Sequence, residues 1–223
     1  MSLMEHLVEL RSRLIRSFVA IAVGAVAGWF LFHPVLNVLR GPLEKLSDDP
    51  NVSDKFLSLD PLEIFMLRIK MSTYLGIAMA MPVILWQIWK FIAPGLYQNE
   101  RRYATAFVAS ATVLFAMGAA IAYYTLPEAL GFLQSMGGES VQYQYSLESY
   151  VTLILYMMVA FGVGFQFPIV VVFLQLVGLV DPQQLASFRR FAIVISFVLA
   201  AVITPSADPI SLVALALPMV VFY

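Results

Sequence analysis

Two carboxylates in the sequence lie beside arginines, where they could bind a cation. Glu9 is in the segment HLVELRSRL, and Glu100 is in the segment YQNERRY. Adjacent residues on a helix do not face each other, so Glu100 is poorly placed to pair with Arg101 or Arg102. A carboxylate left open in this way could accept an external guanidinium, which forms two parallel hydrogen bonds to it.

Glu9 is open to two interpretations. A stripe of leucines at helical spacing predicts an amphipathic N-terminal helix: Leu3, Leu7, Leu10 and Leu14. Glu9 lies four residues before Arg13 on another face of this helix, which is the spacing of a weak local ion pair. The alternative is a functional carboxylate held just above the lipid headgroups, and the sequence leaves both open.

Two further polar residues lie in apolar surroundings. Gln166 falls near the middle of a long apolar run, two residues before Pro168, which removes a backbone donor. A polar group at this depth usually faces a partner or a wet cavity, although a glutamine can also hydrogen-bond to a neighbouring helix. Asp208 precedes a proline, as do Asp60 and Asp181, and this pattern is typical of a helix N-cap. We treat Gln166 and Asp208 as candidate intramembrane or partner-contact residues.

The composition places the chain in a membrane. Of its 223 residues, 61% are hydrophobic and 12% are charged, and the mean hydropathy is +0.86. Soluble domains have about 45–50% apolar and about 25% charged residues. A net charge of −1 gives no reason to expect a nucleic-acid partner. There is no cysteine, and the only histidines, His6 and His33, are far apart in sequence, so no metal site and no cofactor are predicted.

Continuous apolar runs predict an all-α polytopic membrane protein with one transmembrane domain over residues 1–223. The expected spans are 14–32, 68–90, 104–126, 150–177, 190–204 and 210–223. Residues 33–59 and 127–146, which contain glycines and prolines, are expected to be loops. The last two spans are short for a hydrocarbon core of about 30 Å, and the sixth stops in apolar sequence, so we expect it to be truncated.

Basic residues near the ends of the spans give the orientation. Eight of them lie in segments that six spans would place on one side: Arg11, Arg13, Arg16, Lys90, Arg101, Arg102, Arg189 and Arg190. Five lie in or next to the first loop, on the other side: Arg40, Lys45, Lys55, Arg68 and Lys70. The excess predicts a cytoplasmic N-terminus.

Four segments carry a family resemblance. They are HLVELRSRL (His6 to Leu14), FIAPGLYQNERR (Phe91 to Arg102), FGVGFQFP (Phe161 to Pro168) and ITPSADPISLVALALPM (Ile203 to Met219). In this order they closely resemble TatC, the family of multi-span subunits of the twin-arginine protein translocase. The resemblance covers essentially the whole chain.

The resemblance implies six helices in a concave, glove-like arrangement in the bacterial cytoplasmic (inner) membrane, with both termini in the cytoplasm. It implies a receptor and not an enzyme. Members of the family bind signal peptides with consecutive arginines and present folded cargo to single-span TatA/TatB-type subunits, together with other TatC copies, and the proton-motive force drives transport.

The resemblance also assigns residues. The signal-binding carboxylates of the family match Glu9 and Glu100, and we expect Arg11, Arg101 and Arg102 to support them. Gln166 is a departure, because the family usually has a glutamate there, and glutamine keeps the size and the acceptor oxygen but loses the charge.

Two alternatives were weighed against the receptor. A secondary transporter of a small solute would place its midplane site around Gln166, but the sequence shows no inverted repeat and no second broken helix to pair with it. An intramembrane hydrolase is disfavoured because the sequence contains no GxSxG or HExxH motif.

Overall fold

Every element of the computed structural model is a helix in the residues that the structure describes, which are 3–44, 56, 60–92, 104–137, 145–176, 178, 180–205 and 208–223. In chain order the helices are α1 (Leu3–Phe30), α2 (Phe32–Glu44), α3 (Glu63–Ile92), α4 (Ala104–Ser135), α5 (Leu147–Gly164), α6 (Phe167–Leu176), α7 (Pro182–Ile203) and α8 (Pro209–Val221). Five stretches are long and apolar enough to span a membrane: α1, α3, α4, α5 together with α6, and α7. With the shorter apolar helix α8, they confirm the prediction of an all-α polytopic membrane protein.

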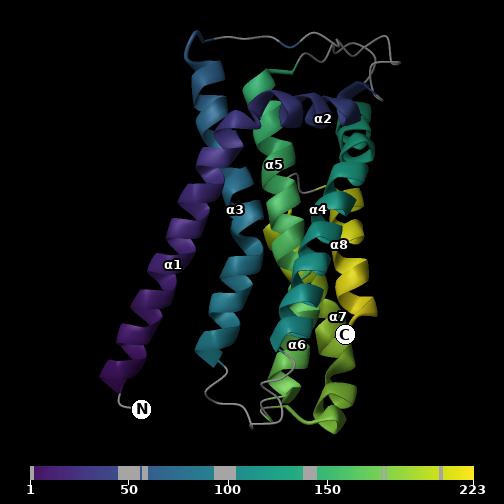
Figure 1. The fold of residues 1–223 in the computed structure, drawn as a ribbon. Helices are drawn as coiled ribbons and strands as arrows, with labels where there is room; N and C mark the ends of the chain where they lie inside the picture. The colour runs from purple at the N-terminus through teal and green to yellow at the C-terminus, as the bar shows by residue number, and fades with distance from the viewer. Residues whose placement is uncertain are drawn as a thin grey trace.

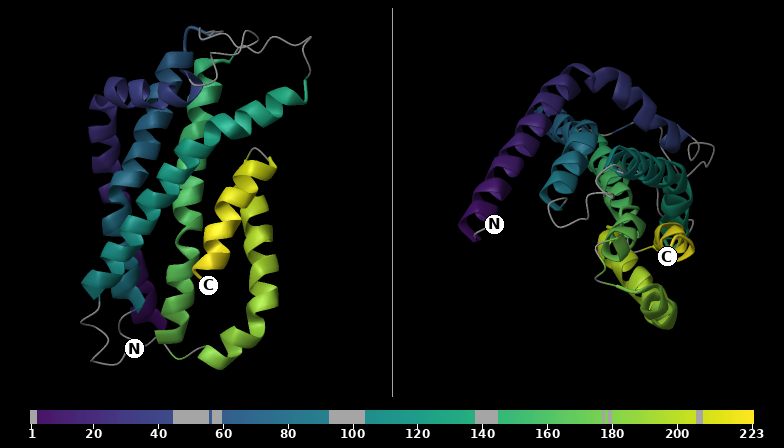
Figure 2. Two further views of the ribbon diagram at one scale, coloured as in Figure 1. Left: turned by 90° about the vertical axis from the view of Figure 1, so that its right-hand side faces the viewer. Right: turned by 60° about the horizontal axis from the view of Figure 1, so that its bottom comes forward.

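The helices form an open arc and not a closed bundle. Figure 1 shows α1, α3 and α5 running along the long axis of the molecule, with α2 leading from the upper end of α1 across α5 towards α4. Seen from the lower end in Figure 2, α1 and α3 lie on one limb of the arc, and α7 and α8 lie on the other. This shape agrees with the concave arrangement that we expected.

Glycines set the separation of α1 and α3. A Cβ atom built on Gly76 of α3 would lie 2.7 Å from both the amide nitrogen of Ala25 and the carbonyl oxygen of Ile21 in α1. A Cβ atom on Gly24 would lie 2.8 Å from the Gly76 carbonyl oxygen. Only residues without a side chain allow two helix backbones to approach so closely, as is common between membrane helices.

Residues 33–59 were expected to form a loop, but α2 occupies the first part of this segment. Its buried residues follow helical spacing: Phe32, Leu36, Leu39 and Leu43. Pro42 cannot donate a backbone hydrogen bond to the Val38 carbonyl, and the Tyr123 hydroxyl of α4 donates to that carbonyl at 2.8 Å. The Tyr150 hydroxyl of α5 donates to the Leu39 carbonyl at 2.9 Å. Two tyrosines therefore hold α2 across the ends of α4 and α5.

The expected loop over residues 127–146 is also partly helical, because α4 continues through Pro127 to Ser135. The buried residues Leu126, Ala129 and Leu130 continue the apolar face of the helix past the proline. Figure 2 shows the last part of α4 turning away from the axis of its first part. Proline bends a helix in this way because its ring clashes with the preceding turn.

A buried carboxylate joins the starts of α3 and α5. Glu63, in the first turn of α3, is only 5% exposed. It accepts hydrogen bonds from the Ser146 hydroxyl and, at 3.1 Å, from the Glu148 amide at the N-terminus of α5. Amides at a helix N-terminus lack partners within the helix, and a carboxylate satisfies both their hydrogen bonds and the helix dipole. Lys70 forms an ion pair with Glu148 and reinforces the same junction.

Two further differences from the expected spans lie in the second half of the chain. The fourth apolar run is broken at Phe165 and Gln166, where α5 ends and α6 has not begun. The backbone N–H of Gln166 donates to the Val163 carbonyl at 3.0 Å, three residues earlier. This turn is tighter than that of an α-helix. α7 begins before the fifth expected span, and the Gln184 side chain accepts a hydrogen bond from the Asp181 amide at its start.

We predict that Gly76→Val lowers the stability of the protein by about 1–3 kcal/mol, because the added atoms would overlap the backbone of α1. Thermal unfolding in detergent micelles would measure the change. The matched control is Ala109→Val, which adds similar atoms to an exposed position of α4 and should leave the unfolding temperature close to that of the parent. Equal unfolding temperatures for the two variants would contradict this account of the α1 and α3 contact.

Candidate functional site

Glu9 lies near the start of α1 and forms an ion pair with Arg13, one turn further along the helix. The Arg13 Nε donates to Glu9 Oε1 at 3.1 Å, and the Arg13 Nη2 donates to the same oxygen. Among the described residues, no hydrogen bond to Glu9 Oε2 is found. The local pair that the spacing predicted is therefore formed, and one oxygen of the carboxylate is left for another donor.

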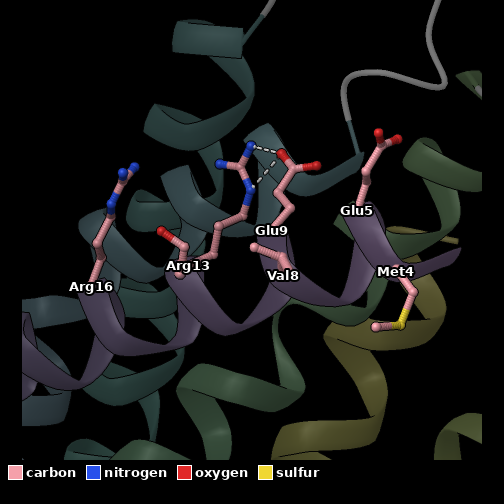
Figure 3. A pocket seen from close by; sticks show the side chains of 7 residues that line it. Met4, Glu5, Val8, Glu9, Arg13 and Arg16 are labelled. Atoms are coloured by element: carbon pink, nitrogen blue, oxygen red, sulfur yellow. Dashed lines mark hydrogen bonds and ion pairs between the residues drawn. The ribbon is translucent and has the colours of Figure 1, made fainter. Parts of the chain in front are cut away.

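The Glu9 and Arg13 pair lies in a shallow hollow on α1, which Figure 3 shows from close by. The described residues that line it are Met4, Glu5, Val8, Glu9, Ser12, Arg13 and Arg16. Two carboxylates and two guanidiniums are thus gathered on successive turns of one helix face. Such a surface can bind a charged peptide segment by hydrogen bonds from its cationic side chains.

A stacking contact ties this part of α1 to the end of α3. The rings of His6 and Phe91 have centroids 4.4 Å apart and are inclined by 23°. His6 opens the segment that contains Glu9, and Phe91 opens the segment that contains Glu100. The contact therefore brings the beginnings of the two segments together, at the end of the molecule where α1 begins and α3 ends (Figure 1).

An aromatic cluster packs around the last turns of α3, just before Phe91. Trp89 is 3% exposed, and its ring centroid lies 4.5 Å from that of Phe107 in α4. Phe173 of α6 contacts both rings, at centroid distances of 6.4 Å and 6.3 Å. Because three helices contribute to this cluster, the end of α3 is well supported where His6 docks on it.

The other predicted residues of this site are only partly covered by the structure. Arg11 lies on α1, and its side chain is exposed. Glu100, Arg101 and Arg102 lie outside the described residues. That the Glu9 and Glu100 carboxylates lie close enough to bind one peptide segment therefore stays a prediction.

Gln166 lies at the break between α5 and α6 and contacts α4. Its Nε2 donates to the Ala111 carbonyl of α4 at 3.0 Å and approaches the Gly162 carbonyl at 3.4 Å. Its Oε1 is buried and has no hydrogen-bond partner within the described part of the chain. The Gln166 side chain therefore links α4 to the break between α5 and α6 through Nε2, while Oε1 accepts no hydrogen bond from the described residues.

Asp208 is 1% exposed and lies directly before α8. Its Oδ1 accepts a hydrogen bond from the Ser211 amide at 2.7 Å. This is the N-cap geometry that the Asp-Pro pattern predicted. Asp60 makes a similar contact before α3, because its Oδ1 accepts from the Leu62 amide at 2.8 Å.

The stack of His6 on Phe91 is the feature of this site that the sequence alone did not reveal. The available signal was that each residue begins one of the two segments that carry the carboxylates. No group of three or more histidine, aspartate or glutamate side chains suited to a metal ion occurs in the part of the chain that the structure describes.

Comparisons with known proteins agree on one family. A family model described as "Sec-independent protein translocase protein (TatC)" matches residues 5–218. The Sec-independent protein translocase protein TatC of Aquifex aeolicus is 39% identical to the chain, and the match covers 100% of the chain and 92% of that protein. TatC of Frankia casuarinae is 38% identical over the whole chain, which spans 64% of its length.

Solved structures give the same result. A crystal structure of the twin-arginine translocase receptor TatC superposes with a TM-score of 0.78 at 38% identity, and the match covers 97% of this chain and 93% of that chain. A second crystal structure of the receptor, in the detergent DDM, gives a TM-score of 0.80, with 98% of this chain and 96% of the other covered.

We predict that His6→Ala loosens the start of α1 from the end of α3, because the stacked ring is lost. Spin labels at the exposed positions Met4 and Lys90 would report the separation, and their distance distribution should broaden. His33→Ala replaces the other histidine, near the opposite end of α1, and should leave the distribution unchanged. A distribution as narrow in His6→Ala as in the parent would show that the stack does not hold α1 in place.

Proposed function

The chain belongs to the TatC family of Sec-independent protein translocase proteins, and from this premise we propose that it is the receptor subunit of a twin-arginine translocase. In this role it binds signal peptides with consecutive arginines and helps to export folded proteins across the membrane. The crystal structures that it resembles at 38% identity are of a twin-arginine translocase receptor.

The observation that carries the proposal is the contact of His6 with Phe91. It brings Phe91, nine residues before Glu100, onto His6, three residues before Glu9, and so supports a common location for the two carboxylates. Two neighbouring arginines of a signal peptide present two guanidiniums within one short segment, so they need two acceptors close together. A carboxylate suits a guanidinium better than an ammonium, because the planar fork donates two parallel hydrogen bonds.

The basic residues at the same end of the molecule indicate the orientation of the chain in the membrane. Three helix segments at this end carry basic residues: the first half of α1, the last turn of α3 and the first half of α7. These residues are Arg11, Arg13, Arg16, Lys90, Arg189 and Arg190. Basic residues concentrate on the cytoplasmic side of membrane proteins. We place this end, and both termini, in the cytoplasm, and the single transmembrane domain over residues 1–223 in the bacterial cytoplasmic membrane.

The proposed partners are signal peptides of folded cargo, single-span TatA/TatB-type subunits, other copies of this chain and lipid. Arg11, Arg101 and Arg102 are proposed to support the signal-binding carboxylates, and Gln166 is the proposed intramembrane contact for a partner. Asp208 is proposed to support a partner contact within the membrane by capping the start of α8. The proposed role is that of a receptor, with no catalytic residue.

A small-solute transporter with a midplane site around Gln166 is not favoured. The Gln166 donor is already used by Ala111, and the family comparisons point to a protein translocase.

We predict that Glu9→Gln and Glu100→Gln each weaken the binding of a twin-arginine peptide by about tenfold or more. A hydrogen bond to a charged group contributes about 1.5–3 kcal/mol, and 1.4 kcal/mol corresponds to a factor of ten. Fluorescence anisotropy with a labelled peptide and the purified full chain would give the Kd. Glu128→Gln removes an exposed carboxylate near the far end of α4 and should leave the Kd unchanged. Binding by Glu100→Gln as tight as that of the parent would refute the proposed site.

We predict that Gln166→Leu impairs export while changing the stability by no more than about 1 kcal/mol. The lost hydrogen bond to Ala111 is offset by removal of a buried acceptor that has no partner. Export of a reporter in cells that lack their own receptor, together with thermal unfolding, would separate the two effects. Gln166→Glu keeps a polar group and should still support export. Normal export by Gln166→Leu would exclude Gln166 as a partner contact.

A further inference from the structure

Arg13 already occupies the carboxylate that the proposed function assigns to the signal peptide. Two of its nitrogens, Nε and Nη2, donate to Glu9 Oε1. The pair is only partly accessible, with side-chain exposures of 15% for Arg13 and 23% for Glu9. A guanidinium of the protein itself therefore lies where a guanidinium of the ligand is expected.

The hydrogen-bond geometry limits what a second guanidinium can do at Glu9. A carboxylate oxygen has about two acceptor positions, and Arg13 uses both of those on Oε1. A bidentate fork needs one hydrogen bond to each oxygen. An incoming arginine can form that arrangement only after Arg13 has released at least one of its bonds to Oε1.

The charges around the pair lead to the same conclusion. The hollow is lined by the carboxylates of Glu5 and Glu9 and by the guanidiniums of Arg13 and Arg16. With two charges of each sign among its described residues, the hollow offers a dicationic peptide segment little net attraction. Moving the Arg13 guanidinium away from Glu9 would restore a local negative charge.

We propose that Arg13 is a built-in competitor for Glu9, which lowers the affinity of the receptor for a signal arginine that bonds both carboxylate oxygens and makes the bound signal easier to release. The inference rests on the proposed function and deepens it. A receptor that hands its cargo to other subunits must release the signal again, and an internal guanidinium can replace the departing one. The carboxylate then keeps a partner in both states.

The size of the effect follows from the strength of the pair. Ion pairs at this helical spacing and at partly exposed sites favour the paired state by about two- to fivefold. Removing the competitor should lower the Kd by the same factor. A lysine ammonium can donate to the open Oε2 alone, whereas a guanidinium fork needs both oxygens, so the factor should be larger for an arginine peptide than for a lysine peptide.

The experiment compares Arg13→Gln with the parent, using the full chain in detergent micelles and two synthetic peptides that differ only in a pair of consecutive arginines or lysines. The Kd of the arginine peptide should fall by about two- to fivefold, and the Kd of the lysine peptide should fall by less. In a Glu9→Gln background, Arg13→Gln should have no further effect. Arg13→Lys keeps the positive charge but loses the planar guanidinium, so it should lower the Kd by less than Arg13→Gln does.

Arg16→Gln is the charge-matched comparison. Arg16 lines the same hollow, and no ion pair between it and Glu9 occurs among the described residues. Its replacement removes the same charge and should lower the Kd by less than Arg13→Gln does. An equal decrease would overturn the competitor in favour of a general charge effect.

Other outcomes also decide the question. Weaker binding by Arg13→Gln would overturn the proposal and make Arg13 a positioning residue that orients Glu9. Should Arg13→Gln unfold, Arg13→Lys carries the test, and a Kd equal to or above that of the parent would count against the proposal. If Glu9→Gln itself leaves the Kd unchanged, the assignment of Glu9 under the proposed function fails. If Glu9→Gln weakens binding but Arg13→Gln does not tighten it, only the competitor fails.

Discussion

The antiparallel contact between α1 and α3 determines where the candidate site lies. Gly24 and Gly76 allow the two backbones to touch where the last third of α1 crosses the middle of α3. Toward one end, Arg68 of α3 donates to the Trp29 carbonyl of α1 at 3.0 Å, and its guanidinium lies 4.4 Å from the centroid of the Trp29 ring. Toward the other end, the His6 stack closes the contact. α1 is otherwise largely exposed in the described structure. These contacts therefore fix the position of Glu9 along the long axis of the molecule.

The two ends of the molecule are held in different ways. At the end with α2, buried polar groups hold the helices together: the Glu63 carboxylate satisfies the N-terminus of α5, and the Tyr150 hydroxyl donates to the Leu39 carbonyl of α2. Such bonds are costly to break, because an unsatisfied buried group loses its hydrogen bonds to water as well. Around Glu9 itself, the side-chain interactions found among the described residues are a ring stack and a local ion pair. The first end can therefore act as a fixed frame, while the second can change partners at low cost.

The helices that follow continuous apolar runs were predictable, since lipid leaves the backbone no other way to satisfy its hydrogen bonds than a helix or a closed barrel. The caps at Asp60 and Asp208 were predictable for a similar reason, because they depend only on local spacing. α2 has the apolar spacing of a helix, but two of its residues are typical of a loop. Gly41 and Pro42 normally indicate a loop, and the hydroxyl that replaces the missing bond at Val38 comes from a distant helix.

The same distinction holds for the candidate site. The pair of Glu9 and Arg13 follows from a spacing of four residues, whereas the contact of His6 with Phe91 and that of Glu63 with Ser146 join residues far apart in sequence. No periodicity records such contacts, because they arise only when the helices have packed.

Gln166 shows why the chemistry of a polar group must be considered together with its position. The amide donates to the Ala111 carbonyl across the break between α5 and α6. An ionised carboxylate has no proton to donate, so a glutamate in this place would have to be protonated to make the same bond or would have to turn elsewhere. Glutamine thus keeps a link between α4 and α5 that an ionised glutamate cannot make. The residue that departs from the expected family pattern is therefore compatible with the packing around it, and any function that requires a negative charge at this depth must be supplied by another group.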